Sequence, residues 1–155
     1  MDTLSKKSKY GLKAAVLLAR RFDQGPVLIS DIAKDEGIPK KFLELILLEL
    51  KNKGILQSRK GRGGGYYLSR APARVNVGEV VRALGGPLAP VACVSQTAYA
   101  PCEDCSDEST CGVRIVMKEV RDAIAGILDR TSLAEVVERV DGLEKLGRGV
   151  LNYDI

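Results

Sequence analysis

The fold is decided by one stretch of the sequence, Arg59-Lys60-Gly61-Arg62-Gly63-Gly64-Gly65-Tyr66-Tyr67. Its run of glycines excludes a helix and is too flexible for the interior of a strand. Short strands are expected on either side, over Ile55–Arg59 and Tyr66–Ser69. Because a strand rather than a helix follows the glycines, a nucleotide phosphate loop is disfavoured. The stretch therefore predicts a β-hairpin with a narrow, basic tip.

The helices before the hairpin follow from apolar spacing and local caps. Gly37 suits the left-handed end of a helix, and Pro39 suits the first position of the next one. The expected helices are Leu4–Arg21, Asp31–Glu36 with Ser30 as its cap, and Lys40–Lys53. Helix, short helix, helix and hairpin is the element order of a winged helix-turn-helix domain.

The C-terminal half predicts a second unit. A capped helix over Asn76–Leu84 is followed by an aperiodic loop over Pro90–Thr110. A long helix over Gly112–Asp129 and a last helix over Ser132–Val140 come next. The long helix has apolar residues at the spacing of a packing seam, namely Val113, Met117, Val120, Ile124 and Ile127.

We therefore expect a mainly α fold with a small β-hairpin: a winged helix-turn-helix domain plus a long helix that serves dimerisation. The expected units are the winged domain (1–86), the cysteine-containing loop (87–111), the long and last helices (112–141) and a flexible tail (142–155).

Charge divides the chain along the same line. Residues 1–75 hold sixteen Lys and Arg against seven Asp and Glu, whereas residues 76–155 hold eight against thirteen. A basic half beside an acidic half indicates a polyanion-binding module joined to another function. The sequence has no histidine, which excludes Ser-His-Asp catalysis and imidazole ligands. Without a membrane-spanning apolar run or a signal peptide, a cytoplasmic protein with no membrane partner is expected.

The expected DNA contacts lie on the third helix and the hairpin. In a helix-turn-helix unit the second helix places its N-terminal residues at the base edges of the major groove, where Lys40, Lys41 and Glu44 stand here. Taken alone, the two lysines are better explained as a solvated helix face, but the basic hairpin directly after them favours DNA. The candidates are Lys40, Lys41, Glu44, Arg59, Lys60, Arg62, Gly63, Gly64 and Tyr66, with Lys6, Lys7, Lys9 and Lys13 as phosphate contacts.

Four cysteines, Cys93, Cys102, Cys105 and Cys111, fall within nineteen residues before the long helix. In a cytosolic chain such clustering indicates metal or redox chemistry rather than structural disulfides. Thiolates select zinc or iron–sulfur clusters, and a spacing with one C-x2-C pair suits a cluster better than a zinc knuckle. Zinc, a thiol switch or no site at all stay open as alternatives.

With these features the chain resembles the bacterial winged-helix regulators typified by IscR, NsrR and CymR. The matching segments are Lys9–Leu12, Ile29–Ala33, Phe42–Glu44, Lys53–Leu56, Gly61–Tyr66, the cysteine loop and Thr131–Glu135. The resemblance implies a homodimer held by the helix over Gly112–Asp129, with each winged domain reading half of a palindromic operator in double-stranded DNA. In cluster-bearing members three cysteines precede this helix. Cys105 and Cys111 match the last two, and Cys93 resembles the first.

The fourth ligand departs from the pattern of these regulators. IscR-like members have a histidine three positions after the last cysteine, where this chain has Arg114. NsrR-like members use an acidic residue on the first helix, near the position of Lys9. Cys102 is an extra cysteine that can supply the missing thiolate, so all four cysteines are the predicted ligands. All-thiolate ligation is compatible with a 2Fe–2S or a 4Fe–4S cluster, with a slight preference for 2Fe–2S.

The sequence thus predicts a non-enzymatic, dimeric DNA-binding transcription regulator controlled by an iron–sulfur cluster. Cluster gain, loss or oxidation would reorganise the Pro90–Thr110 loop and shift the two winged domains. The alternatives are a cluster-free regulator controlled by a partner protein or small effector, or one with a structural zinc or thiol switch. A thiol oxidoreductase built on Cys102 and Cys105 is disfavoured because the pair does not begin a helix beside a strand.

Overall fold

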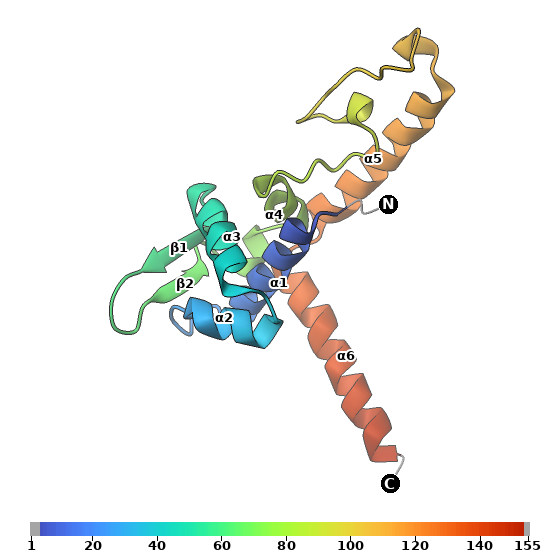
Figure 1. Cartoon of the computed structure of the whole chain (residues 1–155). Helices are drawn as coiled ribbons and strands as arrows, with labels where there is room; N and C mark the ends of the chain where they lie inside the picture. The colour runs from blue at the N-terminus through green and yellow to red at the C-terminus, as the bar shows by residue number, and fades with distance from the viewer. Residues whose placement is uncertain (1–3, 154–155) are drawn as a thin grey trace.

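The computed structural model describes residues 4–153 and the side chains of residues 4–148. Figure 1 shows a body of four helices and a hairpin, from which two long helices extend in different directions. The α-helices are α1 (Lys6–Arg20), α2 (Ile29–Glu36), α3 (Lys40–Asn52), α4 (Val77–Ala83), α5 (Gly112–Arg130) and α6 (Leu133–Tyr153). The strands are β1 (Leu56–Arg59) and β2 (Gly65–Leu68). Short 3-10 turns are η1 (Pro72–Arg74), η2 (Ala92–Val94) and η3 (Glu108–Thr110).

Helix α2 begins earlier than predicted. Ser30 is not its cap, because the N-cap is Leu28 and the first helical residue is Ile29. The cause is Val27, whose backbone exchanges hydrogen bonds of 2.9 Å and 2.8 Å with Tyr66 of β2. This pairing holds the backbone extended up to Leu28, so the helix starts directly after it.

The turn between α2 and α3 follows the local signals closely. Gly37 ends α2 in the left-handed conformation, with φ 65°, as predicted. Pro39 takes the N-cap position of α3 rather than the first helical position, and its carbonyl accepts a hydrogen bond of 2.9 Å from the Leu43 N–H. This short turn sets α3 against α2, as a helix-turn-helix unit requires.

One apolar core holds the body together. It is built mainly from the inner faces of α1 and α3, closed by the hairpin and α4, and joined by Leu133 from the start of α6. Its largest fully buried side chains are Leu18, Ile32, Leu43, Ile46, Leu47, Leu50, Ile55, Leu56, Val75, Val80, Val81 and Leu133. Burying these side chains supplies the main stabilisation of the fold.

The antiparallel hairpin is anchored at its base. Leu56 pairs with Leu68, Gln57 with Tyr67, Ser58 with Tyr66 and Arg59 with Gly65. A side chain at Gly65 would collide with the Val27 carbonyl, and its φ of 145° also favours glycine. Gly65 therefore lets β2 pair closely with Val27, which ties the wing to the start of α2.

Helix α5 contrasts with the body because none of its residues is buried. Its N-terminal end carries the cysteine loop away from the body, and its C-terminal end returns to α4 (Figure 1). There the Arg82 guanidinium donates hydrogen bonds of 2.6 Å and 2.8 Å to the Asp129 carboxylate. The loop predicted over residues 90–110 is irregular except for η2 and η3.

Helix α6 is longer than predicted. The expected end of the helix near Val140 is wrong, since the helix continues to Tyr153, and the predicted tail over residues 142–155 is helical as far as it is described. Gly142 and Gly147 favour an end, but a glycine inside a helix costs only about 1 kcal/mol. The Arg20 side chain of α1 also holds this part of α6, through Asp141 at 2.5 Å and Glu144 at 3.1 Å. Residues 154–155 lie outside the described chain.

Candidate DNA-binding face and cysteine pocket

The first turns of α3 present the predicted base contacts to solvent. Lys40, Lys41 and Glu44 are exposed, while the opposite side of the helix is packed into the core. Within the described residues none of the three forms an ion pair. Their charges are therefore available to an external partner.

The wing presents a second group of free cations. Arg59, Lys60 and Arg62 are exposed, and in the described part of the chain they too have no carboxylate partner. The tip is closed by a hydrogen bond of 3.0 Å from the Gly64 N–H to the Gly61 carbonyl. The hairpin thus presents three positive charges on a thin turn.

Two of the predicted wing contacts have a structural role instead of an exposed one. Gly64 is buried, and a side chain there would collide with the Arg59 carbonyl inside the turn. Tyr66 is half-buried and packs against the core beside Val27. Gly63 is exposed at the tip. We therefore assign Gly64 and Tyr66 to shaping the wing.

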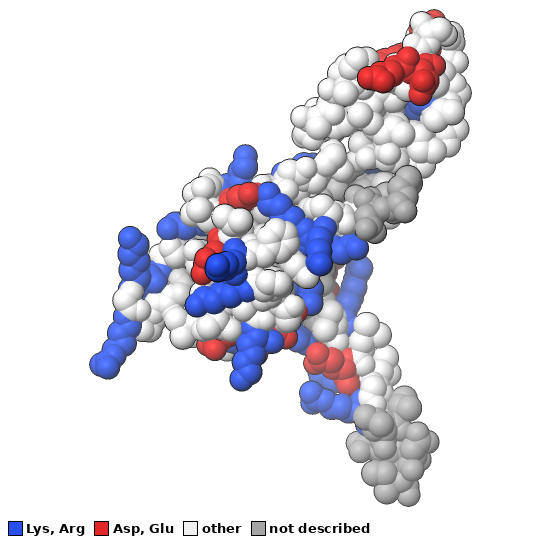
Figure 2. Space-filling model, viewed as in Figure 1, with Lys and Arg blue, Asp and Glu red and all other residues white. Residues whose placement is uncertain are grey.

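The first helix offers fewer free cations than expected. Lys7 pairs with Glu49 of α3 at 2.6 Å, and the Lys13 ammonium donates to the Glu36 carbonyl oxygen at 2.6 Å. Lys6 lies 5.8 Å from the centre of the Tyr10 ring. Figure 2 shows Lys and Arg over the body and wing, with smaller acidic patches among them, and a group of Asp and Glu at the outer end of the cysteine loop. The wing side of this view is therefore mainly basic, and the outer end of the loop is mainly acidic.

Two exposed apolar residues of α3 were not among the predicted contacts. Leu45 and Leu48 of α3 are 60% and 47% exposed on the side of the helix that faces away from the core. The signal was available in the spacing, because the core positions Leu43, Ile46 and Leu47 account for the inner face and leave these two leucines outside it.

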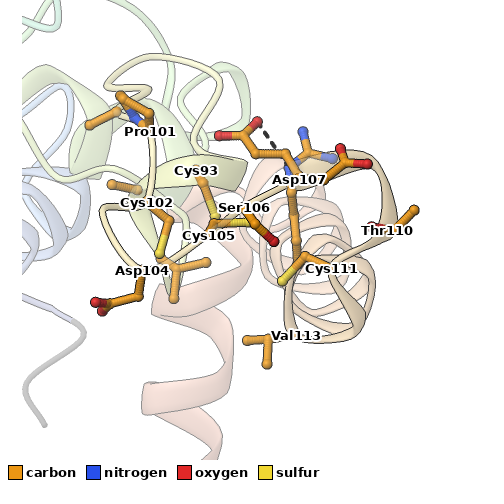
Figure 3. Close-up of a pocket in the computed structure, with 15 residues that line it drawn as sticks. Cys93, Pro101, Cys102, Asp104, Cys105, Ser106, Asp107, Thr110, Cys111 and Val113 are labelled. Atoms are coloured by element: carbon orange, nitrogen blue, oxygen red, sulfur yellow. Dashed lines mark ion pairs between the residues drawn. The ribbon is translucent and has the colours of Figure 1, made fainter.

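The four cysteines line a single pocket of about 510 Å³. It is enclosed by the loop around η2 and η3 and by the first turn of α5. Figure 3 shows the four cysteine side chains around this space, although they come from separate parts of the loop. The structure thus brings together all four thiols that the sequence predicted as ligands.

A few polar contacts hold the loop in this shape. The Arg121 guanidinium of α5 donates a hydrogen bond of 2.8 Å to the Val94 carbonyl, next to Cys93. The Asp107 carboxylate caps η3 by accepting from the Ser109 hydroxyl at 2.7 Å and from the Ser109 N–H at 2.9 Å, and these two bonds lower the pKa of Asp107. Arg121 thus fixes the part of the loop next to Cys93, and Asp107 fixes the turn before Cys111.

The surroundings of Cys111 and Cys105 shift the pKa values of these two thiols in opposite directions. Backbone N–H groups of Arg114 and Val113, at the start of α5, favour the thiolate of Cys111 and lower its pKa. Burial raises the pKa of the Cys105 thiol, which lies close enough to Cys111 for a hydrogen bond between the two side chains. The Cys111 thiol is therefore more readily ionised than the Cys105 thiol.

Arg114 also lines the pocket and leaves a donor unused. Its Nε is buried and, among the described residues, has no hydrogen-bond partner. The Glu108 Oε2 atom lies 3.7 Å away, while the other oxygen of that carboxylate accepts from the Tyr99 hydroxyl at 2.7 Å. Arg114 is therefore ion-paired with Glu108 but, within the described chain, has no hydrogen bond at Nε, and the same pocket is also lined by Asp104 and Asp107.

These groups fit a polynuclear cluster better than a single ion. Within residues 4–148 no three Cys, Asp or Glu side chains are gathered closely enough to hold one metal ion. In a cluster the four thiolates are divided between the iron atoms, two on each iron of 2Fe–2S and one on each iron of 4Fe–4S. Soft thiolates agree with that class of cofactor.

No helix in the described part of the chain is long and apolar enough to cross a membrane.

The chain matches a known family over most of its length. The family model for Rrf2, described as an iron-dependent transcriptional regulator, matches residues 4–139. An rrf2-like HTH-type transcriptional regulator of Rhodobacter capsulatus is 41% identical over 146 residues, which cover 92% of this chain and 97% of that protein. The expected resemblance is confirmed, and the relatives are named as transcriptional regulators rather than enzymes.

Two solved structures are similar in fold and sequence. CymR, named as the global cysteine regulator of B. subtilis, has a TM-score of 0.74 and 29% identity, covering 90% of this chain and 98% of that chain. IscR of T. potens has a TM-score of 0.71 and 28% identity, covering 88% and 87%. The mainly helical fold with a small hairpin is therefore confirmed. One neighbour is named CymR and the other IscR. The comparison therefore does not decide between control by an iron–sulfur cluster and cluster-free control.

Proposed function

The chain belongs to the Rrf2 family of iron-dependent transcriptional regulators, and we propose that an iron–sulfur cluster held by its four cysteines controls its binding to DNA. The proposed ligands are Cys93, Cys102, Cys105 and Cys111. The observation that carries the proposal is that all four thiols line one pocket at the outer end of α5. When bound, such a cluster supplies a centre that gains or loses an electron and is sensitive to oxidants.

Arg114 supports an all-thiolate cluster in particular. Four thiolates leave a cluster more negative than ligation by a neutral histidine would. The Arg114 guanidinium lines the pocket, and its buried Nε has no hydrogen-bond partner among the described residues, although it forms an ion pair of 3.7 Å with Glu108. Cys102 as the fourth ligand and Arg114 as the balancing charge thus form one consistent arrangement. We prefer 2Fe–2S and keep 4Fe–4S as an outcome.

A homodimer is the second part of the proposal. Helix α5 exposes a line of apolar residues that its own chain does not cover: Val113 is 65% exposed, Val116 52%, Val120 38% and Ile127 62%. Their spacing places them on one side of the helix. Covering this stripe with the same stripe of a second copy would bury it by two-fold symmetry. Two winged domains would then face the two halves of a palindromic operator.

The pocket and the winged domain are connected through α5. The Arg121 bond to the Val94 carbonyl attaches α5 to the loop near Cys93, and the Arg82–Asp129 pair attaches its other end to α4. Loss of the cluster would release the loop beside the proposed dimer stripe. The placement of the two wings, and hence the operator spacing that they fit, would change with it.

Anaerobic purification tests the cofactor directly. The expected result is a brown protein with about two irons and two sulfides per protomer, or about four of each for the larger cluster. Cys111→Ser should remove the colour and the iron. A colourless wild-type protein that carries zinc on protected thiols would contradict the proposal.

The fourth ligand has a sharper test. Cys102→Ser should lose most of the bound iron and sulfide. The double variant Cys102→Ser/Arg114→His should recover it, since it restores the histidine that IscR-like regulators carry three positions after the last cysteine. Cys102→Ser/Arg114→Gln is the matched control and should stay empty. Full loading of Cys102→Ser alone would exclude Cys102 as a ligand.

A cluster-free regulator is the second candidate function. It is favoured by the likeness to CymR and by the lack of a compact three-ligand site within residues 4–148. In that case Cys105→Ser would leave operator binding, and its response to a partner protein or small effector, unchanged.

A further inference from the structure

The outward side of α3 carries an apolar pair that the fold does not need. Leu45 and Leu48 are 60% and 47% exposed, whereas Leu43 and Leu47, on the other side of the same helix, are fully buried. Single exposed leucines are common on protein surfaces, but two that lie three positions apart form a continuous apolar strip. Such a strip on the exposed face of a helix marks a contact surface.

The neighbours of this strip identify what covers it. Lys41, Glu44, Leu45 and Leu48 stand at spacings of three and four, so they share one side of α3. Lys40 and Lys41 at its N-terminal end form no ion pair within the described chain, and neither do the three wing cations. An apolar strip framed by free cations suits a polyanion with apolar groups on its floor better than a second protein surface. The major groove of DNA is such a surface.

We propose that Leu45 and Leu48 read the 5-methyl groups of thymine in the operator. The inference rests on the proposed use of α3 as the recognition helix. The thymine methyl is the one apolar group that base edges present in the major groove. A leucine against a G·C pair would instead leave the guanine acceptors or the cytosine amino group without a partner, at a cost in binding. Each half-site should therefore carry T·A pairs opposite the middle of α3.

The polar readers lie one turn earlier and specify different bases. Lys41 suits guanine and Glu44 suits the amino group of cytosine. The side of α3 that faces the groove thus passes from charged to apolar residues along the helix. The predicted half-site accordingly has G·C pairs opposite the start of α3 and adjacent thymines opposite its second turn.

The test begins with a sequence selected from random duplex DNA by the wild-type protein, prepared anaerobically as purified. Thymines that the selection enriches are then replaced by deoxyuridine, which removes only the methyl group. Each methyl buried against a leucine should be worth roughly fourfold in affinity, so replacement of one such thymine in each of the two half-sites should weaken binding roughly fifteenfold. Fluorescence anisotropy at constant salt measures the ratio of the two dissociation constants.

Variants assign the effect to the leucines. Leu45→Ala and Leu48→Ala replace exposed side chains, so unchanged thermal unfolding is expected, and their binding should no longer distinguish thymine from uracil at one position each. Leu143→Ala is the matched control, because Leu143 is 68% exposed on α6, away from α3. It should keep the wild-type ratio.

Three results would overturn the inference. Equal binding of thymine and uracil duplexes by the wild-type protein would do so while leaving DNA binding itself intact. A change in molecular mass on Leu45→Ala, with an unchanged thymine-to-uracil ratio, would show that the strip covers a protein. Failure of the wild-type protein to enrich any sequence would reject the DNA-reading role of α3 together with the inference.

Discussion

The body, which comprises α1 to α4 and the hairpin, differs from the arm, which comprises α5 and the cysteine loop, in how it is stabilised. All the buried apolar residues in the described chain except Val94 and Leu133 lie between Ala14 and Leu84, in the body. In α5 no residue is buried, although the helix is longer than any in the body. The loop at its outer end is held by hydrogen bonds such as those of Arg121 and Asp107.

This difference suits the body and the arm to different functions. The body contains the contacts that fold it, so it can hold α3 and the wing rigidly against DNA. The arm lacks a core and, on our proposal, obtains its missing contacts from a second protomer and a cofactor. A region stabilised from outside can respond to what stabilises it, because losing a ligand or partner changes its shape. The sensor and the interface therefore belong on the arm.

The largest expected effect separates the two regions by stability. Leu47→Ala removes a fully buried side chain from the core of the body and should lower the free energy of unfolding by about 2–5 kcal/mol. Val116→Ala on the exposed stripe of α5 should change it by less than about 0.5 kcal/mol in dilute, monomeric protein. Urea unfolding followed by circular dichroism gives both values. Equal losses would mean that α5 has a core of its own.

The next prediction tests whether a second protomer covers the exposed apolar stripe of α5. Val116→Glu with Val120→Glu places two charges in the proposed dimer stripe and should convert the dimer to a monomer. Since one wing then binds one half-site alone, operator affinity should fall roughly a hundredfold, or about 2.7 kcal/mol. Light scattering and anisotropy measure mass and affinity. Lys118→Glu, on the other side of α5, is the control and should stay dimeric.

The wing gives a smaller effect, which depends on salt. Lys60→Ala with Arg62→Ala should reduce operator affinity roughly tenfold and lower the slope of log affinity against log salt by about 0.9 for each lost phosphate contact. Lys145→Ala on α6 changes a comparable exposed cation away from the wing and should leave both quantities unchanged. If the double variant binds as tightly as the wild-type protein at every salt concentration, the wing does not contact DNA.

The sequence predicted the body well because its signals are local. The glycine run marked the wing, Gly37 marked the end of α2, and the Asn76 side chain caps α4 by accepting from the Glu79 N–H at 2.8 Å. At the predicted start of the last helix, Ser132 and Glu135 form a capping box, since the side chain of each accepts the other's backbone N–H. Caps and glycine conformations depend on a few neighbouring residues, so they can be read without the fold.

The predictions were wrong where contacts between residues far apart in the sequence determine the bounds of a helix. The start of α2 depends on Val27 pairing with Tyr66, and the length of α6 depends partly on Arg20 reaching Asp141 and Glu144. Cysteine spacing indicated a shared site, but not that Cys93 and Cys102 would line the same pocket as the first turn of α5. That required the loop to fold back onto this turn. Long-range contacts of this kind leave no periodic trace in the sequence.

The smallest expected effect lies at the joint between the two regions. The Arg82 guanidinium, which bonds the Asp129 carboxylate directly, holds the pKa of Asp129 below its ordinary value near 3.8. A lowered carboxyl pKa adds stability above the ordinary value and loses it as the pH falls through the lowered one. Both side chains are about a third or more exposed, so Asp129→Asn should cost less than about 1 kcal/mol at pH 7. The stabilities of variant and wild type should converge in acid, below the ordinary Asp value. A difference that stays constant down to pH 2 would mean that α4 and α5 are joined by packing and not by this ion pair.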